Sequence, residues 1–199
     1  RSGSDGAGYA LARSLGVDVT ERIFPALVPL TLPRDHVLCS LSGVAAPAAL
    51  GLYAPGGKRL HQTTGALLCT HFGLSGPAAL DFSRYFLDAQ FADPAVCVAV
   101  HWLPDLTGEA LEAELLTLGK SGVLRWLARR LPERLARALL SEARVEPGTT
   151  GDALSREARR ALIQQVTQMP LPLTGTRGFT YAEVTAGGVP LSELRLETM

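Results

Sequence analysis

The sequence has no excess of charge of either sign. Its 199 residues include 19 Lys or Arg and 19 Asp or Glu, so the formal net charge is zero. Proteins that bind nucleic acids or anionic membranes by electrostatic attraction usually carry a basic excess. The balanced composition therefore argues against both kinds of partner.

The sequence also lacks long hydrophobic segments and has few cysteines. No apolar run approaches the roughly 18 residues of a membrane-spanning helix, and no signal peptide precedes the first predicted helix. Cys39, Cys69 and Cys97 are widely spaced and have apolar neighbours. This pattern predicts buried thiols in a reducing compartment and argues against disulfides or a zinc site. We therefore expect a cytoplasmic location.

Hydrophobic residues make up 47% of the chain and charged residues 19%, which is typical of a globular protein with a real core. Residues 17–103 contain short β-forming runs separated by Gly- and Pro-rich turns, a spacing that favours a small barrel or sandwich. A helix is expected at residues 77–87, with Pro77 at its first position. The predicted strands are residues 26–32, 37–41, 48–53, 58–62, 66–70 and 96–103.

Residues 104–168 have a different character, because leucines recur there at helical spacing and no strand pattern is found. Thr107 and Ser155 are predicted helix caps, and Gly119 is predicted to end the first helix. Two prolines follow, and the chain returns to a strand pattern. The predicted fold class is α+β: a small antiparallel β-barrel-like domain (17–103 and 169–199) with an inserted all-α helical subdomain (104–168).

The two ends of the chain hold its most informative stretches. Asp5 and Gly16 are predicted to begin and end an N-terminal helix. Residues 174–189 predict a turn, a strand at 179–185 and the pair Gly187–Gly188. Such a pair indicates a positive φ or a close approach of the backbone to another group, although a plain hairpin turn is the simpler alternative. The chain begins at Arg1 without Met, so we expect a segment of a longer protein.

Three motifs resemble those of one family. The first lies near the end of the chain and consists of Thr-Gly-Thr-Arg-Gly-Phe, then Ala-Glu-Val-Thr-Ala-Gly-Gly-Val, then Glu193 and Thr198-Met199. The second is Thr-His-Phe-Gly-Leu-Ser-Gly-Pro at 70–77, and the third is residues 2–16. Together they resemble the BaiN/RdsA (YhiN-like) flavoproteins, which are NAD(P)/FAD-dependent oxidoreductases. The resemblance implies that this chain is their middle segment, with the same plan of a barrel-like domain carrying a helical insert.

The resemblance also implies a site. Gly187 and Gly188, preceded by Thr185, would lie against the isoalloxazine of FAD, and Asp5 and Gly6 would lie beside the cofactor. Ala7 stands where the family often has an Asp, so a carboxylate contact would fall to Asp5. The helix at 1–16 would belong to the flanking FAD-binding domain, which would be the partner of this segment. NAD(P)H is the implied reductant and a small organic molecule the implied substrate; the segment alone would not hold FAD.

His71 and Arg177 are the candidate catalytic residues. Arg177 lies in a turn, where it would serve either a structural ion pair or an anionic substrate or cofactor. Ser75, His71 and Asp81 would also permit a hydrolase triad, but the G-x-S-x-G motif is missing. His36, His61 and His101 are isolated, so no metal site is expected. The alternative function is a non-catalytic docking module with a barrel like those of translation factors.

Overall fold

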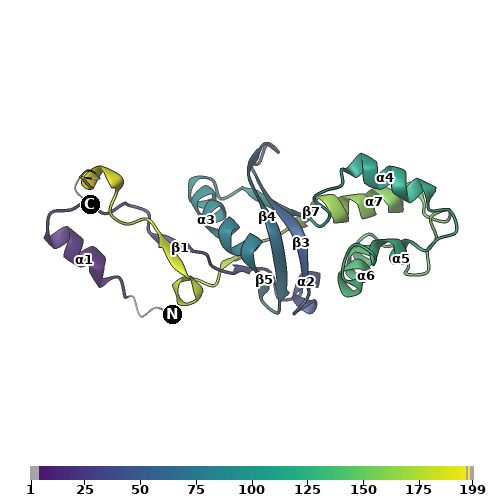
Figure 1. Ribbon diagram of the computed structural model, residues 1–199, viewed down its shortest axis with the longest axis horizontal. Helices are drawn as coiled ribbons and strands as arrows, with labels where there is room; N and C mark the ends of the chain where they lie inside the picture. The colour runs from purple at the N-terminus through teal and green to yellow at the C-terminus, as the bar shows by residue number, and fades with distance from the viewer. Residues whose placement is uncertain (1–4, 196, 198–199) are drawn as a thin grey trace.

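The computed structural model describes residues 5–195 and 197, and it has three parts along its longest axis (Figure 1). The end lobe holds α1 (Ala7–Ser14) and a two-stranded sheet of β1 (Phe24–Ala26) and β9 (Val184–Ala186). A barrel-like sheet occupies the middle, and four helices form the opposite end. Residues 2–4 and Thr198–Met199, which contributed to the motifs, lie outside the described residues.

The central sheet has seven antiparallel strands in the order β7-β6-β3-β4-β5-β2-β8. Its edge strands β7 and β8 follow each other in the chain, with only residues 172–174 between them. Because each residue spans at most about 3.6 Å, the two edges must lie close together, and the sheet curls. The strands are β2 (Leu30–Thr31), β3 (Ala45–Tyr53), β4 (Arg59–Thr70), β5 (Gly73–Ser75), β6 (Cys97–His101), β7 (Met169–Leu171) and β8 (Gly175–Thr176).

The core of the barrel lies between this sheet and α3 (Pro77–Ala92), which begins at Pro77 as predicted. Alternate residues of β3 and β6, such as Leu50, Leu52 and Val98, are buried, and Phe82 and Phe86 of α3 pack in the same cluster. The period of two along the strands puts their apolar side chains on the face of the sheet that α3 covers. The spacing of Phe82 and Phe86 along α3 puts both rings on the face of the helix that packs against the sheet.

The helices α4 (Gly108–Thr117), α5 (Val123–Leu127), α6 (Glu133–Glu142) and α7 (Arg156–Thr167) lie between β6 and β7 in the chain. The predicted caps are confirmed: Thr107 Oγ1 accepts from the Ala110 N–H and Ser155 Oγ from the Ala158 N–H, both at 3.2 Å. The buried residues of these helices form one continuous cluster with those of the barrel. None of the described helices is long and apolar enough to cross a membrane.

Two strand predictions in the first half are wrong. Residues 37–41 form a short helix, α2 (Val37–Ser40), because His36 Nδ1 accepts a hydrogen bond from the Leu38 N–H and caps it. The pair 58–62 and 66–70 is one strand, β4, without a turn at 63–65. β4 pairs continuously with β3 there, and Gly65 lies opposite Ala48. Backbone pairing across the sheet therefore overrides the local turn signal.

Three other predictions need correction. The strand at 26–32 is broken at Leu27, whose φ is 48°. The strand at 179–185 is a 3₁₀ turn, η1 (Phe179–Tyr181), followed by β9; a second such turn, η2, covers Leu191–Glu193. Cys39 and Cys69 are buried free thiols as expected, but Cys97 is exposed because its side chain alternates with the inward-facing Val98.

We predict that the chain loses stability as the pH falls below the ordinary pKa of histidine. Burial lowers the pKa of His36 and of His101 from 6.5. Nearby carboxylates and, for His101, a hydrogen bond with the Leu106 backbone oppose this shift only in part. The unfolded chain therefore binds protons that the folded chain does not, and unfolding is favoured in acid. Urea midpoints should be lower at about pH 5.5 than at about pH 7.

The double variant His36→Asn/His101→Gln is the control, because Asn can still cap α2. Its urea midpoint should change less between the two pH values than that of the parent chain. An unchanged pH dependence in this variant would assign the effect to other groups.

Candidate functional site

The predicted cofactor residues Gly6 and Gly188 both lie next to one aromatic ring in the end lobe. A Cβ built on Gly6 would lie 3.6 Å from the Tyr9 ring, and one built on Gly188 would lie 4.0 Å from it. Tyr9 belongs to α1, whereas Gly188 follows β9 (Figure 1). The fold therefore brings the start of the chain and the Gly187–Gly188 turn to one place.

The two glycines of this turn are required for different reasons. Gly187 has φ 88°, and a Cβ there would lie 2.2 Å from the Arg22 carbonyl oxygen, so the chain's own backbone excludes any side chain. Gly188 has φ 144°, and a Cβ there would meet only the Tyr9 ring, at ordinary contact distance. The described chain thus explains Gly187 by close packing, and Gly188 only by its backbone conformation.

Thr20 holds the turn in place, and the sequence pattern gave no signal for it. Its N–H donates to the Gly188 carbonyl oxygen at 2.8 Å, and its Oγ1 accepts from the Gly188 N–H at 2.8 Å. The same hydroxyl donates to the Arg22 carbonyl oxygen at 3.2 Å. An isolated Thr in a loop has many roles, so only the tertiary contact reveals this one.

Asp5 and Thr185, the other two predicted cofactor residues, also lie in the end lobe and are exposed. Asp5 Oδ1 accepts from the Ala7 N–H at 2.9 Å, which places a carboxylate at the start of α1. The N-cap position itself belongs to Gly6, whose φ is 85°, and Gly16 ends the helix with φ 76° as predicted. Thr185 pairs with Pro25 across the two-stranded sheet.

His71 and Arg177 come together at the neighbouring edge of the barrel. The Arg177 guanidinium lies 4.4 Å from the centre of the Phe72 ring and 3.4 Å from that of Tyr181, so two aromatic rings hold it. His71 is exposed, and the centre of its ring lies 5.1 Å from that of the Phe72 ring, with the two rings nearly perpendicular. Among the described residues no carboxylate forms an ion pair with Arg177, which leaves its charge available to an anion.

The structure does not assemble a hydrolase triad. Ser75 pairs with Leu68 in the sheet, and Asp81 interacts with Arg84 and Thr63. No hydrogen bond in the described part of the chain joins His71 to either residue. Within the same part, no group of three His, Cys, Asp or Glu side chains is placed to hold a metal ion.

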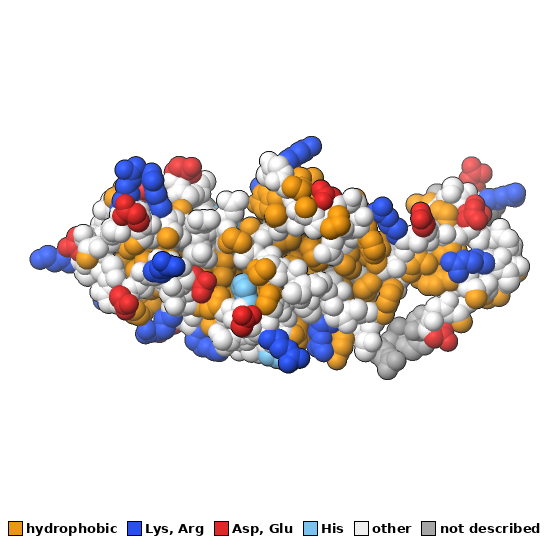
Figure 2. Space-filling view, turned by 180° about the vertical axis from the view of Figure 1, so that it is seen from behind, with side chains coloured by type: hydrophobic (Ala, Val, Ile, Leu, Met, Phe, Trp, Pro, Cys, Tyr) orange, Lys and Arg blue, Asp and Glu red, His pale blue; other side chains and the backbone are white. Residues whose placement is uncertain are grey.

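The end lobe leaves large apolar side chains uncovered. α1 has no buried residue, and its Leu11 and Leu15 are 62% and 72% exposed. Leu191 is 70% exposed in the same lobe, as are Phe179 and Val184 to a smaller degree. Figure 2 shows that hydrophobic side chains also cover much of one face of the barrel. A helix with no buried residue gains little stability from packing within this chain.

The helical end carries a basic cluster around α5. Lys120, Arg125 and Arg129 are exposed, and no described carboxylate forms an ion pair with them. Together they line a hollow of about 330 Å³, and the two arginines also line an adjoining one of about 520 Å³. Elsewhere on these helices, Arg130, Arg137 and Arg159 pair with glutamates.

Comparison with known proteins agrees with this architecture. The family described as "HI0933-like protein barrel and H2TH domain" matches residues 24–184. The ribosomal RNA dihydrouridine synthase of Escherichia coli (strain K12) is 34% identical in an alignment 200 residues long, gaps included, that covers 99% of this chain and 47% of that protein. The 3-dehydro-bile acid delta(4,6)-reductase of Clostridium scindens is 29% identical in an alignment 201 residues long, gaps included, that covers 99% of this chain and 48% of that protein.

A ribosomal RNA dihydrouridine synthase of Haemophilus influenzae is also similar, at 29% identity in an alignment 196 residues long, gaps included, that covers 96% of this chain and 45% of that protein. The chain therefore spans about half the length of the curated relatives it matches.

We predict that Thr20→Val loosens the Gly187–Gly188 turn. The substitution keeps the shape of the side chain but removes the acceptor of the Gly188 N–H and the donor to Arg22. A net loss of about 1 kcal/mol, or roughly a fivefold faster exchange of the Gly188 amide hydrogen, is expected. Thr180→Val is the control, because Thr180 is exposed and has no side-chain hydrogen bond in the described structure. Equal exchange rates in the two variants would contradict the assigned role of Thr20.

Proposed function

The chain belongs to the HI0933-like family of flavoproteins, which includes the BaiN/RdsA type, and from this premise we propose that it forms the substrate-side cover of an FAD-binding domain in a longer oxidoreductase. The longer protein would pass hydride between NAD(P)H, FAD and a small organic substrate. The segment alone would not hold FAD and would be inactive.

The observation that carries this proposal is the difference between the two glycines of the turn. Packing within the chain excludes a side chain at Gly187, whereas a Cβ on Gly188 would have only the Tyr9 ring within 4 Å, at ordinary contact distance. A flat ring system lying against Gly188 would need that space, because a Cβ would stand between the ring and the backbone. Gly6 and the Asp5 carboxylate belong to the same lobe, and both Gly6 and Gly188 lie next to the Tyr9 ring.

The exposed apolar side chains of the end lobe support a covering partner. We propose that the flanking FAD-binding domain packs on Leu11, Leu15 and Leu191, and that residues 1–16 belong to that domain. In this plan residues 17–103 and 169–199 form the barrel-like domain, and residues 104–168 form an inserted helical subdomain. Apolar surface left uncovered on a separate segment is expected where a second domain docks.

Bound FAD would supply the hydride transfer, and this chain would place the substrate. Arg177, which two rings hold and no described carboxylate neutralises, is suited to fix an anionic group of a substrate or cofactor. His71, at the edge of the same cluster, is exposed and available as a proton donor or acceptor. One relative is named as a reductase and two as synthases of dihydrouridine. These names favour reduction of the substrate as the direction of the reaction.

Gly188→Ala in the longer protein tests the proposal. We expect FAD to bind at least about tenfold more weakly, because the new Cβ would clash with the ring. The backbone strain of a residue other than Gly at this positive φ burdens the apo and the FAD-bound protein alike, so it lowers stability and not affinity. Gly16→Ala is the matched control: Gly16 also has a positive φ in the end lobe, but nothing lies within 4 Å of its added Cβ. FAD fluorescence titrations and apo-protein melts separate affinity from stability.

Two outcomes would count against the proposal. Equal FAD affinity in the Gly188→Ala and Gly16→Ala proteins would return Gly188 to the role of a plain turn residue. A longer protein that purifies colourless and takes up no FAD would favour the alternative, a docking module without catalysis.

The basic cluster around α5 favours RNA as a second candidate substrate class. The balanced net charge argues against nucleic acid, but Lys120, Arg125 and Arg129 concentrate unpaired positive charge at one place. Two relatives are named ribosomal RNA dihydrouridine synthases, which makes an RNA substrate worth testing here. In that case the helical end would contact the phosphate backbone while the flavin acts at the opposite end.

Binding of an RNA hairpin to the chain at several salt concentrations tests this candidate. Arg125→Gln/Arg129→Gln should weaken binding and reduce the salt slope by about 1.8, as expected for two lost phosphate contacts. Arg156→Gln/Arg160→Gln is the control, since both arginines are exposed on α7 outside the two hollows and the change in charge is equal. Equal losses in both variants, or no binding at low salt, would exclude RNA recognition by this cluster.

A further inference from the structure

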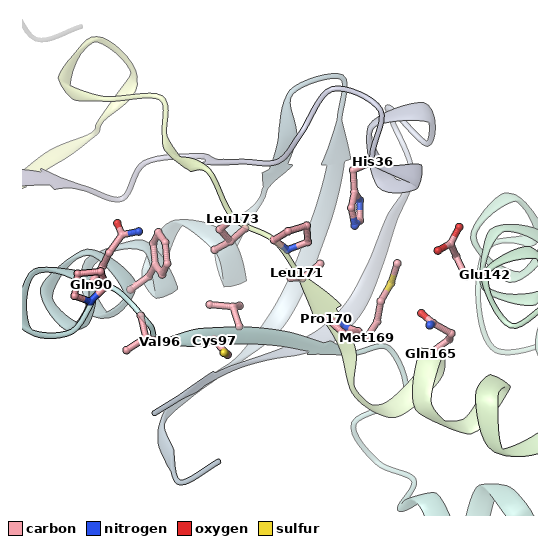
Figure 3. A pocket seen from close by; sticks show the side chains of 14 residues that line it. His36, Gln90, Val96, Cys97, Glu142, Gln165, Met169, Pro170, Leu171 and Leu173 are labelled. Atoms are coloured by element: carbon pink, nitrogen blue, oxygen red, sulfur yellow. The ribbon is translucent and has the colours of Figure 1, made fainter. Parts of the chain in front are cut away.

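A cavity of about 570 Å³ lies where the barrel meets the helical end (Figure 3). It runs along β7, the edge strand of the sheet, whose outer side has no strand partner. Pro170 and Pro172 lie on this edge and lack N–H groups, so their positions offer no donor to a further strand. This edge is therefore better suited to a small molecule than to an added strand.

The floor of the cavity is apolar. Leu171 and Leu173 lie in its middle, with Val96 toward the end of α3 (Figure 3), and Val98 and Phe86 are also among the lining residues. The cavity volume is within the range of about 300–1,000 Å³ that is typical of sites for small molecules. An elongated apolar body would cover this floor.

Three polar side chains from separate elements converge at the helical end of the cavity (Figure 3). His36 precedes α2, Glu142 ends α6 and Gln165 lies on α7. His36 Nδ1 accepts from the Leu38 N–H at 3.3 Å, so the neutral ring carries its proton on Nε2. No hydrogen bond from another described residue engages the Glu142 or Gln165 side chain, so both remain available to a ligand.

We propose that this cavity binds an uncharged amphipathic small molecule, whose apolar body lies on Val98, Leu171 and Leu173 and whose hydroxyl or amide head group reaches His36, Glu142 and Gln165. Such a head group accepts from the imidazole N–H and the Gln165 amide and donates to the Glu142 carboxylate. The site is separate from the proposed flavin site, which lies in the end lobe.

Charge selects the neutral head group. The lining includes no Lys or Arg, and the Glu142 carboxylate would repel an anion. A cationic ammonium group has donors only and would leave the imidazole N–H without an acceptor. Attraction between an ammonium and the exposed Glu142 is weak because water screens it.

The methyl group of Met169 reports on binding, because Met169 lines the cavity and the chain contains only one other methionine, Met199. In NMR titrations of the 199-residue chain with methyl-labelled methionine, 1-octanol should shift the Met169 resonance in a saturable way. Octanoate and octylammonium should bind more weakly by about fivefold or more, the fold-change of one hydrogen bond. The variant Met199→Leu assigns the resonance.

Two variants test the head-group contacts. His36→Asn keeps an acceptor that can cap α2 but removes the Nε2–H, and Gln165→Leu removes the side-chain amide. Each variant should lower the affinity for 1-octanol by about fivefold. Gln164→Leu, at the exposed neighbouring position of α7 outside the cavity, should leave its affinity unchanged.

Three results would overturn the proposal. The first is octanoate binding as tightly as 1-octanol. The second is an unchanged affinity for 1-octanol in both His36→Asn and Gln165→Leu, which would show only partition onto an apolar surface. The third is a Met169 resonance that no probe shifts.

Discussion

The pairing of β6 with β7 is the constraint on which the rest of the structure depends. Val100 lies opposite Met169, so the chain leaves the sheet after β6 and returns to it as the neighbouring strand. All four helices of the helical end lie in this excursion. The backbone N–H of Trp102 donates to the Val166 carbonyl oxygen at 2.8 Å, and its ring is buried, so the junction is both hydrogen-bonded and packed. One continuous apolar cluster then spans barrel and helices.

The same pairing determines how the barrel closes. β7 lies at one edge of the sheet and leads within a few residues to β8 at the other edge. Backbone connectivity, rather than a ladder of hydrogen bonds, brings these two edges together. A seam without strand pairing has room for side chains from the helices, and this is where His36, Glu142 and Gln165 meet over an apolar floor. The cavity is therefore a consequence of the topology.

The end lobe is organised differently, because it has almost no core of its own. Thr20 and the β1–β9 pairing hold the Gly187–Gly188 turn, whereas α1 buries none of its residues. Such a lobe is positioned by hydrogen bonds within this chain and, in our proposal, by a docked domain outside it. Arg177 is held between Phe72 and Tyr181, at the border between the lobe and the barrel. A surface of this kind is suited to a cofactor and substrate that arrive from the partner side.

The sequence by itself determined those features that depend on near neighbours in the chain. Thr107 and Ser155 cap their helices as their side chains predict, Pro77 begins α3, and Gly16, Gly187 and Gly188 have positive φ. The family motifs also identified a flavoprotein segment. Each of these signals rests on residues a few positions apart, where side-chain chemistry and backbone geometry act directly.

Only the tertiary structure decided the features that depend on distant partners. β4 is continuous through a Thr-Thr-Gly turn signal because β3 pairs along its length. Thr20 forms a hydrogen bond with Gly188, which lies far from it in the sequence. Only Gly fits at position 187, because a Cβ there would collide with the Arg22 carbonyl oxygen. Pairing energy and steric exclusion between segments far apart in sequence leave no periodic trace, so the physical reason for these residues appears only once the chain is folded.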